Sequence, residues 1–249
     1  MNKNEIGLVL YTVRDRAEKD FAATLREVAE IGYGCAEICG TFGLEAAAVR
    51  DLGEELGLRL LSAHVALGDV TEHFHKTMRY YSTVGVEALV VPWLDENLRD
   101  SVAAAKKTAR LLNHIGARLE DNGLSFMFHH HDVEFKPIGG TTAWDVLVAE
   151  SDAKLVGFEV DTFWVAKGGR DPLEVLRTIE GRARYIHVKD MTRDGAMTEV
   201  GAGTLDLAAI AAARKKLGVK CFFVEHDEPK RPSMNSARKS FEYLRKKIT

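Results

Sequence analysis

The sequence contains little cysteine and no long apolar run. Its three cysteines, Cys35, Cys39 and Cys221, form no CxxC pair, and an odd number of thiols does not suit a disulfide framework or a zinc ribbon. We interpret them as small buried hydrophobic residues in a reducing compartment. The opening residues lack the charged-then-apolar pattern of a secretory signal. With no apolar run of membrane-spanning length, we expect a cytoplasmic protein without a membrane partner.

An excess of positive charge is also missing. The formal net charge is −3 and the isoelectric point is near 6.3, so no basic field favours a nucleic-acid backbone or an anionic membrane. We therefore expect no nucleic-acid partner. What is present is a chain of 249 residues with 46% hydrophobic residues. That is enough for a sizeable core and close to the size of one α/β barrel.

Short runs rich in β-branched and aromatic residues alternate with longer runs of helical period. The eight candidate strands are 6–12, 35–40, 59–65, 88–94, 125–131, 156–165, 185–190 and 221–227. Candidate helices include 20–32 and 100–123, and the first has an apolar face formed by Phe21, Leu25 and Val28. Glycines that suit left-handed helix ends follow many of these helices: Gly32, Gly57, Gly85, Gly123 and Gly218. Asp171-Pro172 predicts the start of another helix.

This alternation predicts one (β/α)8 barrel over residues 1–249. No linker or low-complexity tract interrupts it, and no GxGxxG follows the first strand, which disfavours a doubly wound sheet. In such barrels the chemistry gathers at the carboxyl ends of the strands. Polar residues at or just past those ends are therefore the candidates for a site: Tyr11, Arg14, His64, Trp93, His129, His130, His131, Asp132, Glu134, Glu159, Asp161, His187, Lys189, Glu225 and Asp227.

Strand alternation sorts the three consecutive histidines of the fifth strand. Side chains two positions apart share a face, so His129 and His131 point one way and His130 the other. We expect His130 to pack outward against a helix or loop. In the same way, Glu159 and Asp161 share a face.

A ring formed by Asp161, His187 and Glu225 offers carboxylates and one imidazole, which suit Mn²⁺, Mg²⁺ or Co²⁺, with Zn²⁺ as a further option. Burying so many charges is costly unless a cation or mutual pairing compensates them. The alternative is that these acids pair with Arg14, Lys189 or Arg193 across the mouth of the barrel.

The motifs at these positions resemble the sugar phosphate isomerase/epimerase family, which has a xylose isomerase-like TIM barrel. The resemblance covers nearly the whole chain. It rests on the segments GLVLYTVRD, FMFHHHDVEF, VDTFWVAKGGRDP, IHVKD, VGAGTLD and FFVEHDEP, taken in this order and spacing. The family includes keto-sugar epimerases, hydroxypyruvate isomerases, inosose dehydratases and the endonuclease IV branch.

The resemblance implies metal ligands at Asp161, His187 and Glu225. Many relatives have a glutamate where this chain has His129, whereas in one subgroup with an HNHDxEF segment the acid lies further on, at Glu134 here. We take Glu134 as the fourth ligand and keep His129 as the alternative, and His131 as a ligand or proton carrier. His130 replaces the asparagine of that subgroup. The expected ion is Mn²⁺, with Mg²⁺, Co²⁺ or Zn²⁺ as alternatives.

Such an ion could bind two adjacent oxygens of a hydroxy-ketone, polarise the carbonyl and stabilise the enediolate that forms when the neighbouring proton leaves. We assign proton transfer to Glu134, Glu225, His131 and Lys189. Substrate binding is assigned to a separate group: His64, Trp93, His129, Trp164 and Arg193. The expected partner is a small-molecule sugar or polyol ketone, and the protein is expected to act as an isomerase or epimerase.

Other functions stay open at this point. A dehydratase or lyase acting on a keto-sugar, keto-inositol or 3-keto-glycoside would use the same enediolate. A phosphodiesterase of the endonuclease IV type would need more inward ligands and a basic groove. An amidohydrolase-type barrel would carry its His-x-His pair on the first strand. A non-catalytic barrel that binds a partner remains an alternative, as does a homo-oligomer built on the alanine-rich segment 100–123.

Overall fold

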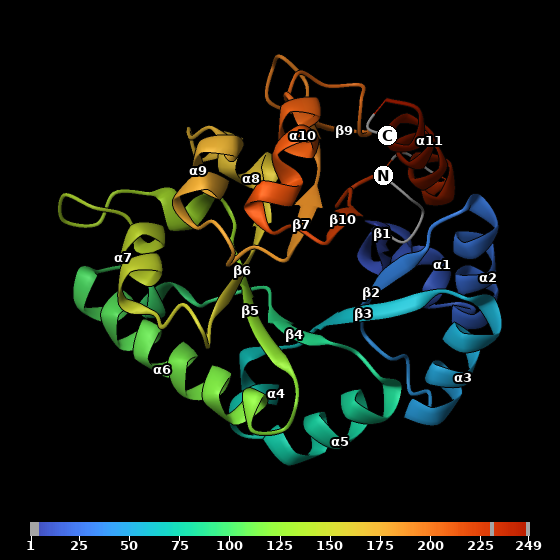
Figure 1. The fold of residues 1–249 in the computed structure, drawn as a ribbon, viewed down its shortest axis with the longest axis horizontal. Coiled ribbons are helices and arrows are strands. Elements are labelled where there is room, and N and C mark those ends of the chain that lie inside the picture. Colours follow the sequence, from blue (N-terminus) through green and yellow to red (C-terminus); the bar gives the residue numbers. More distant parts are fainter. Residues whose placement is uncertain (1–4, 230–231, 248–249) are drawn as a thin grey trace.

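The computed structural model describes residues 5–229 and 232–247, and its centre is a closed barrel of eight parallel strands (Figure 1). The order around the barrel is β1-β10-β7-β6-β5-β4-β3-β2. Neighbouring barrel strands therefore follow one another in the chain, and β10 closes the ring against β1. The bounds are β1 Ile6–Val9, β2 Cys35–Cys39, β3 Arg59–His64, β4 Ala88–Val91, β5 Ser125–His129, β6 Gly157–Asp161, β7 Tyr185–Val188 and β10 Cys221–Val224.

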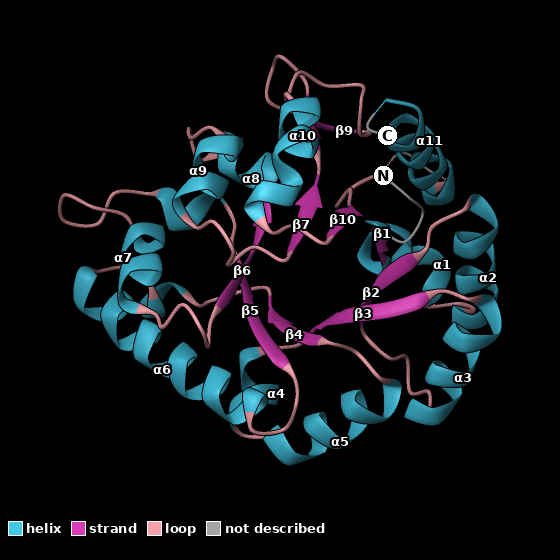
Figure 2. Ribbon diagram, viewed as in Figure 1, coloured by secondary structure: helices cyan, strands magenta, loops and turns pink. Residues whose placement is uncertain are grey.

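Helices surround the barrel, as Figure 2 shows in cyan around the magenta strands. They are α1 Arg14–Ala17, α2 Phe21–Ile31, α3 Ala46–Leu56, α4 Leu67–Thr71, α5 Phe74–Val84, α6 Val102–Glu120, α7 Ala143–Glu150, α8 Thr162–Lys167, α9 Pro172–Thr178, α10 Leu207–Leu217 and α11 Ser233–Lys247. Short 3₁₀ turns are η2 Leu10–Val13, η3 Glu96–Leu98 and η4 Asp132–Phe135. A small antiparallel pair, β8 Asp190–Met191 and β9 Met197–Thr198, follows β7. None of the described helices is long and apolar enough to cross a membrane.

All eight predicted strand runs contain a barrel strand, which confirms the predicted fold class. Several runs extend further than their strands, because the chain turns sharply at the mouth of the barrel. The run 156–165 ends as a strand at Asp161, whose Oδ1 accepts the N–H of Trp164 at 2.9 Å and so caps α8. Hydrophobic residues such as Val165 continue the run but belong to a helix.

Most predicted helix ends are also confirmed. Asp20 caps α2, Asp171 caps α9, and helices α2, α3, α5 and α10 each end at a left-handed glycine. Gly123 is an exception. Helix α6 ends at Glu120, and Gly123 follows in the next turn, with a φ of 77°. A positive φ of this kind costs glycine little, so the residue still suits the turn.

Two layers of apolar residues form the core. The barrel interior contains a cluster that includes Val9, Leu61, Val90, Met127 and Phe223. A larger cluster lies between the strands and the surrounding helices, with Leu8, Ile38, Leu112 and Phe158 among its fully buried members. This packing fixes the strand ends, so the polar residues at the barrel mouth are held on a rigid frame.

Candidate metal and substrate site

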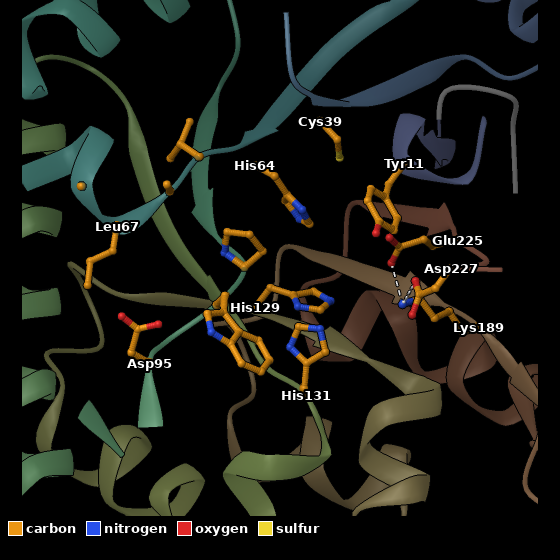
Figure 3. Close-up of a pocket in the computed structure, with 15 residues that line it drawn as sticks. Tyr11, Cys39, His64, Leu67, Asp95, His129, His131, Lys189, Glu225 and Asp227 are labelled. Atoms are coloured by element: carbon orange, nitrogen blue, oxygen red, sulfur yellow. Dashed lines mark hydrogen bonds and ion pairs between the residues drawn. The ribbon is translucent and has the colours of Figure 1, made fainter. Parts of the chain in front are cut away.

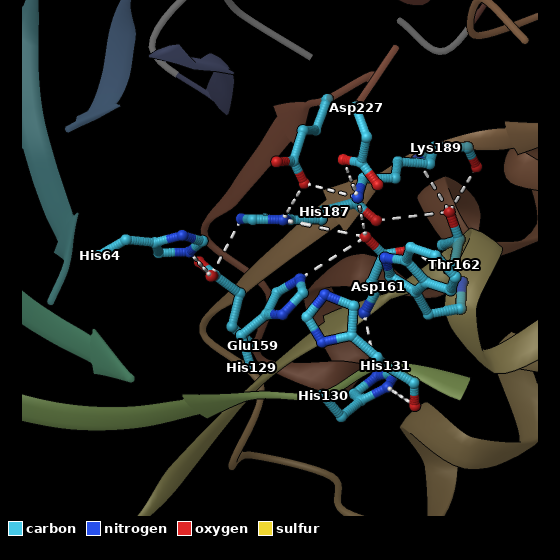
Figure 4. A network of polar contacts seen from close by, with 12 residues as sticks. His64, His129, His130, His131, Glu159, Asp161, Thr162, His187, Lys189 and Asp227 are labelled. Carbon is cyan, nitrogen blue, oxygen red and sulfur yellow. Dashed lines mark hydrogen bonds and ion pairs between the residues drawn. The ribbon is translucent and has the colours of Figure 1, made fainter. Parts of the chain in front are cut away.

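Four side chains from consecutive barrel strands converge at the carboxyl end of the barrel (Figure 4). His129 ends β5, Asp161 ends β6, His187 lies in β7 and Glu225 directly follows β10. One potential ligand atom from each lies within 4.8 Å of the others, and all four residues are buried. We call these four residues the upper group. Strand register explains part of this geometry, because Asp161 pairs with His187 across β6 and β7.

The upper group contains buried polar atoms that lack hydrogen-bond partners among the described residues. These atoms are both ring nitrogens of His129, Oδ2 of Asp161, Nδ1 of His187 and Oε2 of Glu225. His187 Nδ1 lies 2.7 Å from Glu225 Oε2 and His129 Nε2 lies 3.6 Å from Asp161 Oδ2, but neither contact has hydrogen-bond geometry. Buried polar atoms are normally paired. Two imidazoles and two carboxylates that converge without hydrogen bonds at these atoms form a ligand set that fits a divalent cation.

A buried lysine lies beside the upper group. The Nζ atom of Lys189 is 3.1 Å from Asp161 Oδ2, 2.9 Å from Glu225 Oε2 and 2.7 Å from Asp227 Oδ1. Burial alone would lower the pKa of Lys189, but these three carboxylates raise it, so the side chain is an ammonium ion. Burial and the charge of Glu225 raise the pKa of Asp227 to about 6. Lys189 therefore offsets part of the negative charge of these carboxylates. Such a pairing is the alternative to a bound cation that the sequence left open.

A second group of four residues lies against the upper group and shares His187 with it. Its members are Glu37, His64, Glu159 and His187. Nε2 of His187 lies 2.8 Å from Glu37 Oε2 and 2.9 Å from Glu159 Oε2, and Nε2 of His64 lies 3.0 and 3.1 Å from the same oxygens. The two imidazole rings stack with a centroid distance of 5.4 Å. We call these residues the lower ring.

The lower ring is held together by charge and by hydrogen bonds. Burial would raise the pKa of Glu37, but the imidazoles of His64 and His187 lower it, so Glu37 is ionised. Burial would lower the pKa of His64, but the Glu37 carboxylate raises it well above its usual value. Ser62 donates its hydroxyl to Glu37 Oε1 at 2.7 Å. Each member of the lower ring therefore has a partner within it, although Glu159 Oε1 is a further buried oxygen without a hydrogen bond among the described residues.

A cavity of about 740 Å³ opens above these residues (Figure 3). Polar side chains that line it come from the ends of β3, β5, β7 and β10: His64, His129, His131, Lys189, Glu225 and Asp227. Tyr11 and Cys39 line it after β1 and in β2. The remaining lining residues belong to the segments after β3 and β4: Val65, Ala66, Leu67, Gly68, Pro92, Trp93 and Asp95.

Glu134, which we expected as the fourth ligand, lies outside the upper group and the lower ring. It lies in η4, where its Oε2 accepts the backbone N–H of His131 at 2.7 Å and its Oε1 lies 3.2 Å from Arg99 Nε. Burial raises the pKa of Glu134 to about 7. Because the chain turns tightly after β5, the Glu134 carboxylate bonds to the backbone at the start of η4 and does not reach the upper group. The place expected for Glu134 is occupied by His129, the alternative that the sequence left open.

The other two histidines of the fifth strand separate as predicted. His130 packs outward against Phe135 and Trp144 of α7, and its Nε2 accepts the backbone N–H of Asp161 at 3.1 Å. His131 lies just past β5 and lines the cavity between Trp93 and Trp164. Burial and the charge of Lys189 lower the pKa of His131 to about 4.

Two residues predicted to bind substrate do not line the cavity. Arg193 is exposed in the hairpin loop between β8 and β9. Trp164 lies in α8 behind His131 and Lys189, with a ring centroid 5.0 Å from His131 and 5.4 Å from Lys189 Nζ. The position of a residue after a strand end does not locate them, because Arg193 lies within an extra hairpin and Trp164 follows the sharp turn at Asp161.

Sequence reasoning missed Glu37. This residue lies in the middle of β2, flanked by apolar residues and by Cys35 and Cys39 on the same face. A fully buried glutamate within an otherwise apolar strand is the signal that could have revealed it. Its partners come from β3, β6 and β7, so only the closed barrel brings them together.

Comparison with known proteins agrees with the barrel fold. The sequence pattern of the xylose isomerase-like TIM barrel family matches residues 25–247. This chain belongs to that family. A relative named inosose dehydratase, from Bacillus anthracis (strain CDC 684 / NRRL 3495), is 22% identical over 198 residues. The match covers 72% of this chain and 66% of the relative, so it spans just under two thirds of that relative.

Solved structures show the same fold at low sequence identity. A sugar phosphate isomerase/epimerase from Parabacteroides distasonis ATCC 8503 has a TM-score of 0.86 at 22% identity and covers 97% of both chains. The IOLI protein, whose structure contains a bound zinc atom, has a TM-score of 0.75 at 16% identity and covers 98% of this chain and 99% of its own. The family thus includes sugar-processing enzymes, and at least one member of the fold binds a metal ion.

Proposed function

We propose that this protein is a metal-dependent lyase that removes water from a keto-sugar or keto-cyclitol. The observation that carries the proposal is the convergence of orphaned donor atoms in the upper group. The name of the curated relatives, inosose dehydratase, supports elimination of water rather than isomerisation. The cavity above the upper group supports a small polar substrate, because histidine, lysine and carboxylate side chains line one side of it.

Four residues would hold the ion: His129, Asp161, His187 and Glu225. Two imidazole nitrogens and two carboxylate oxygens suit Zn²⁺ or Mn²⁺ better than Mg²⁺, which prefers oxygen ligands alone. We propose Zn²⁺ or Mn²⁺ as the resident ion. When bound, the cation supplies positive charge that stabilises the negative charge developing on the ketone oxygen as the neighbouring proton leaves.

The proposed reaction uses two cavity residues for proton transfer. His131 lies at the end of β5 and faces the cavity, where its imidazole would accept the proton from the carbon next to the ketone. The electrons of that C–H bond would form a double bond to the next carbon, whose C–O bond breaks. Lys189 would donate a proton to the departing hydroxyl, which leaves as water. Asp227, 2.7 Å from Lys189 Nζ, would hold the ammonium in position.

Isomerisation or epimerisation is the second candidate, because it begins with the same proton transfer. The structural likeness to a sugar phosphate isomerase/epimerase favours it to that extent. The outcome depends on whether the proton returns to a carbon or a hydroxyl departs first. A hydroxyl on the adjacent carbon and a protonated donor near it favour elimination, and Lys189, which is paired with Asp161 and Glu225, would be such a donor.

The test combines metal analysis with product analysis. The purified protein is stripped with a chelator, reloaded with Zn²⁺ or Mn²⁺, and incubated with keto-inositol and with keto-hexoses in D₂O. We expect a metal-dependent product that has lost one molecule of water, and we expect Asp161→Asn to abolish it. Asp100→Asn, which makes the same change at an exposed aspartate outside the cavity lining, is the matched control and should retain activity. Deuterium incorporation without water loss would favour the isomerase, and no metal-dependent change would reject both.

A further inference from the structure

The cavity above the metal-binding residues has one polar side and one apolar side. The polar side follows β5, β7 and β10 and includes His131, Lys189 and Asp227. The apolar side lies across the barrel, after β3 and β4, and includes Val65, Leu67, Pro92 and Trp93. Because β3 and β4 are neighbours in the barrel, these residues form one continuous wall. Asp95 is the one carboxylate at the lip of that wall.

Exposed aromatic residues strengthen this division. Trp93 is 48% exposed and Tyr11 is 41% exposed, and both line the cavity. Among the described residues the exposed large hydrophobic side chains are Tyr11, Phe42, Leu44 and Trp93, and all four lie in segments that follow the carboxyl ends of barrel strands. An exposed apolar surface next to a polar site indicates that an apolar group is bound there.

The size of the cavity exceeds the requirement of a single sugar ring. A volume of about 740 Å³ lies within the range of sites for molecules much larger than one ring, roughly 300–1,000 Å³. A free sugar or cyclitol is polar on all sides. Bound at the upper group, it would leave the wall of Val65, Leu67 and Pro92 unused.

We propose that the substrate is a sugar or cyclitol ketone that carries an apolar substituent. The substituent would bind against the apolar wall formed by Val65, Leu67, Pro92 and Trp93. The inference rests on the proposed function, because the ketone end is placed at the upper group. The substituent would contact aliphatic side chains of the β3 and β4 segments and stack on Trp93. The free, unsubstituted ketone would then be the poorer substrate.

The first experiment measures binding and requires no turnover. D-Glucose and phenyl β-D-glucopyranoside are titrated into the metal-loaded protein by calorimetry. We expect the phenyl glucoside to bind about tenfold tighter, since burying an aromatic ring adds at least ~1.4 kcal/mol, which is a factor of ten. Phenol alone should bind much more weakly than the glucoside. Equal affinities for the two sugars, or no detectable binding of either, would overturn the inference.

Matched variants test the location. Leu67→Asn places an amide in the apolar wall, whereas Leu44→Asn makes the same change at an exposed leucine outside the cavity lining. We expect Leu67→Asn to lose most of the preference for the phenyl glucoside and Leu44→Asn to keep it. Retention of the full preference in Leu67→Asn would contradict the inference. These sugars lack the reactive ketone, so the result is separable from failure of the proposed lyase activity.

Discussion

Glu37 and His187 lie 150 positions apart in the chain, yet Glu37 Oε2 and His187 Nε2 are 2.8 Å apart and both side chains are fully buried. An ionised carboxylate can only accept a hydrogen bond, so Nε2 of His187 carries the proton. In the neutral form of His187, Nδ1 is then the nitrogen with the lone pair, and it faces Asp161 and Glu225. Glu37 thereby fixes the form of His187 that can bind a metal ion.

The first prediction follows from this contact. Glu37→Gln should weaken Zn²⁺ or Co²⁺ binding about 10- to 100-fold without removing a ligand, as is typical when the outer partner of a metal-binding histidine is lost. Affinity is measured by competition with a chelator, and the visible spectrum of the Co²⁺ form reports a change in the ligand field. Ser62→Ala, which removes only the hydroxyl donated to Glu37, is the control and should have a smaller effect. A Glu37→Gln affinity within twofold of the wild type would contradict the positioning role.

The second prediction distinguishes the two candidates for the fourth ligand. His129→Ala should strongly reduce the metal content of the purified protein, because it removes an imidazole with two orphaned nitrogens. Glu134→Gln should leave the content unchanged, since Glu134 bonds to His131 N–H and pairs with Arg99 instead. Elemental analysis of both variants measures the bound metal per chain and so distinguishes the two candidate ligands. Metal loss only in Glu134→Gln would restore the ligand set expected from the sequence.

The third prediction concerns metal and stability. Zn²⁺ at about 100 times its dissociation constant should raise the free energy of unfolding by about 2.7 kcal/mol. Asp161→Asn should lose this gain and still fold, because an asparagine oxygen can cap Trp164 N–H as Asp161 Oδ1 does. Thermal unfolding with and without Zn²⁺ measures both. An equal metal-induced shift in wild type and variant would place the ion elsewhere.

The fourth prediction concerns pH. Glu134 is 1% exposed, and burial raises its pKa to about 7 from an ordinary value of 4.5. A raised pKa in the folded state gives stability that is present below about pH 4.5 and is lost as the pH rises through 7.

Glu134→Gln removes this titration. In the presence of a chelator, the wild type should lose about 3 kcal/mol more than the variant between pH 4.5 and 7.5, at roughly 1.4 kcal/mol for each unit of pKa difference. Denaturant unfolding at several pH values measures the difference. Glu120→Gln, on an exposed helix end, is the control and should follow the wild type. A parallel pH dependence in wild type and Glu134→Gln would show that Glu134 is not shifted.

Much of the candidate site could be predicted from polar residues at the carboxyl ends of the strands, because the last residues of all the parallel barrel strands lie at the same end of the barrel. Asp161, His187 and Glu225 needed only the order of strands, and the opposite directions of His129 and His130 needed only alternation. Glu134 was misplaced because its direction depends on a 3₁₀ turn and on Arg99, neither of which the periodicity encodes. Glu37 was missed because its partners lie on three other strands, so its role exists only in the closed barrel.

Asp161 divides its carboxylate between two tasks. Oδ1 starts helix α8, whereas Oδ2 faces the upper group. A longer side chain such as glutamate could not reach the same N–H and the same donors together. We therefore expect sequence variation among related proteins at other positions, such as His129 or the apolar wall, and an aspartate at the end of β6, because the same carboxylate caps α8 and would hold the proposed ion.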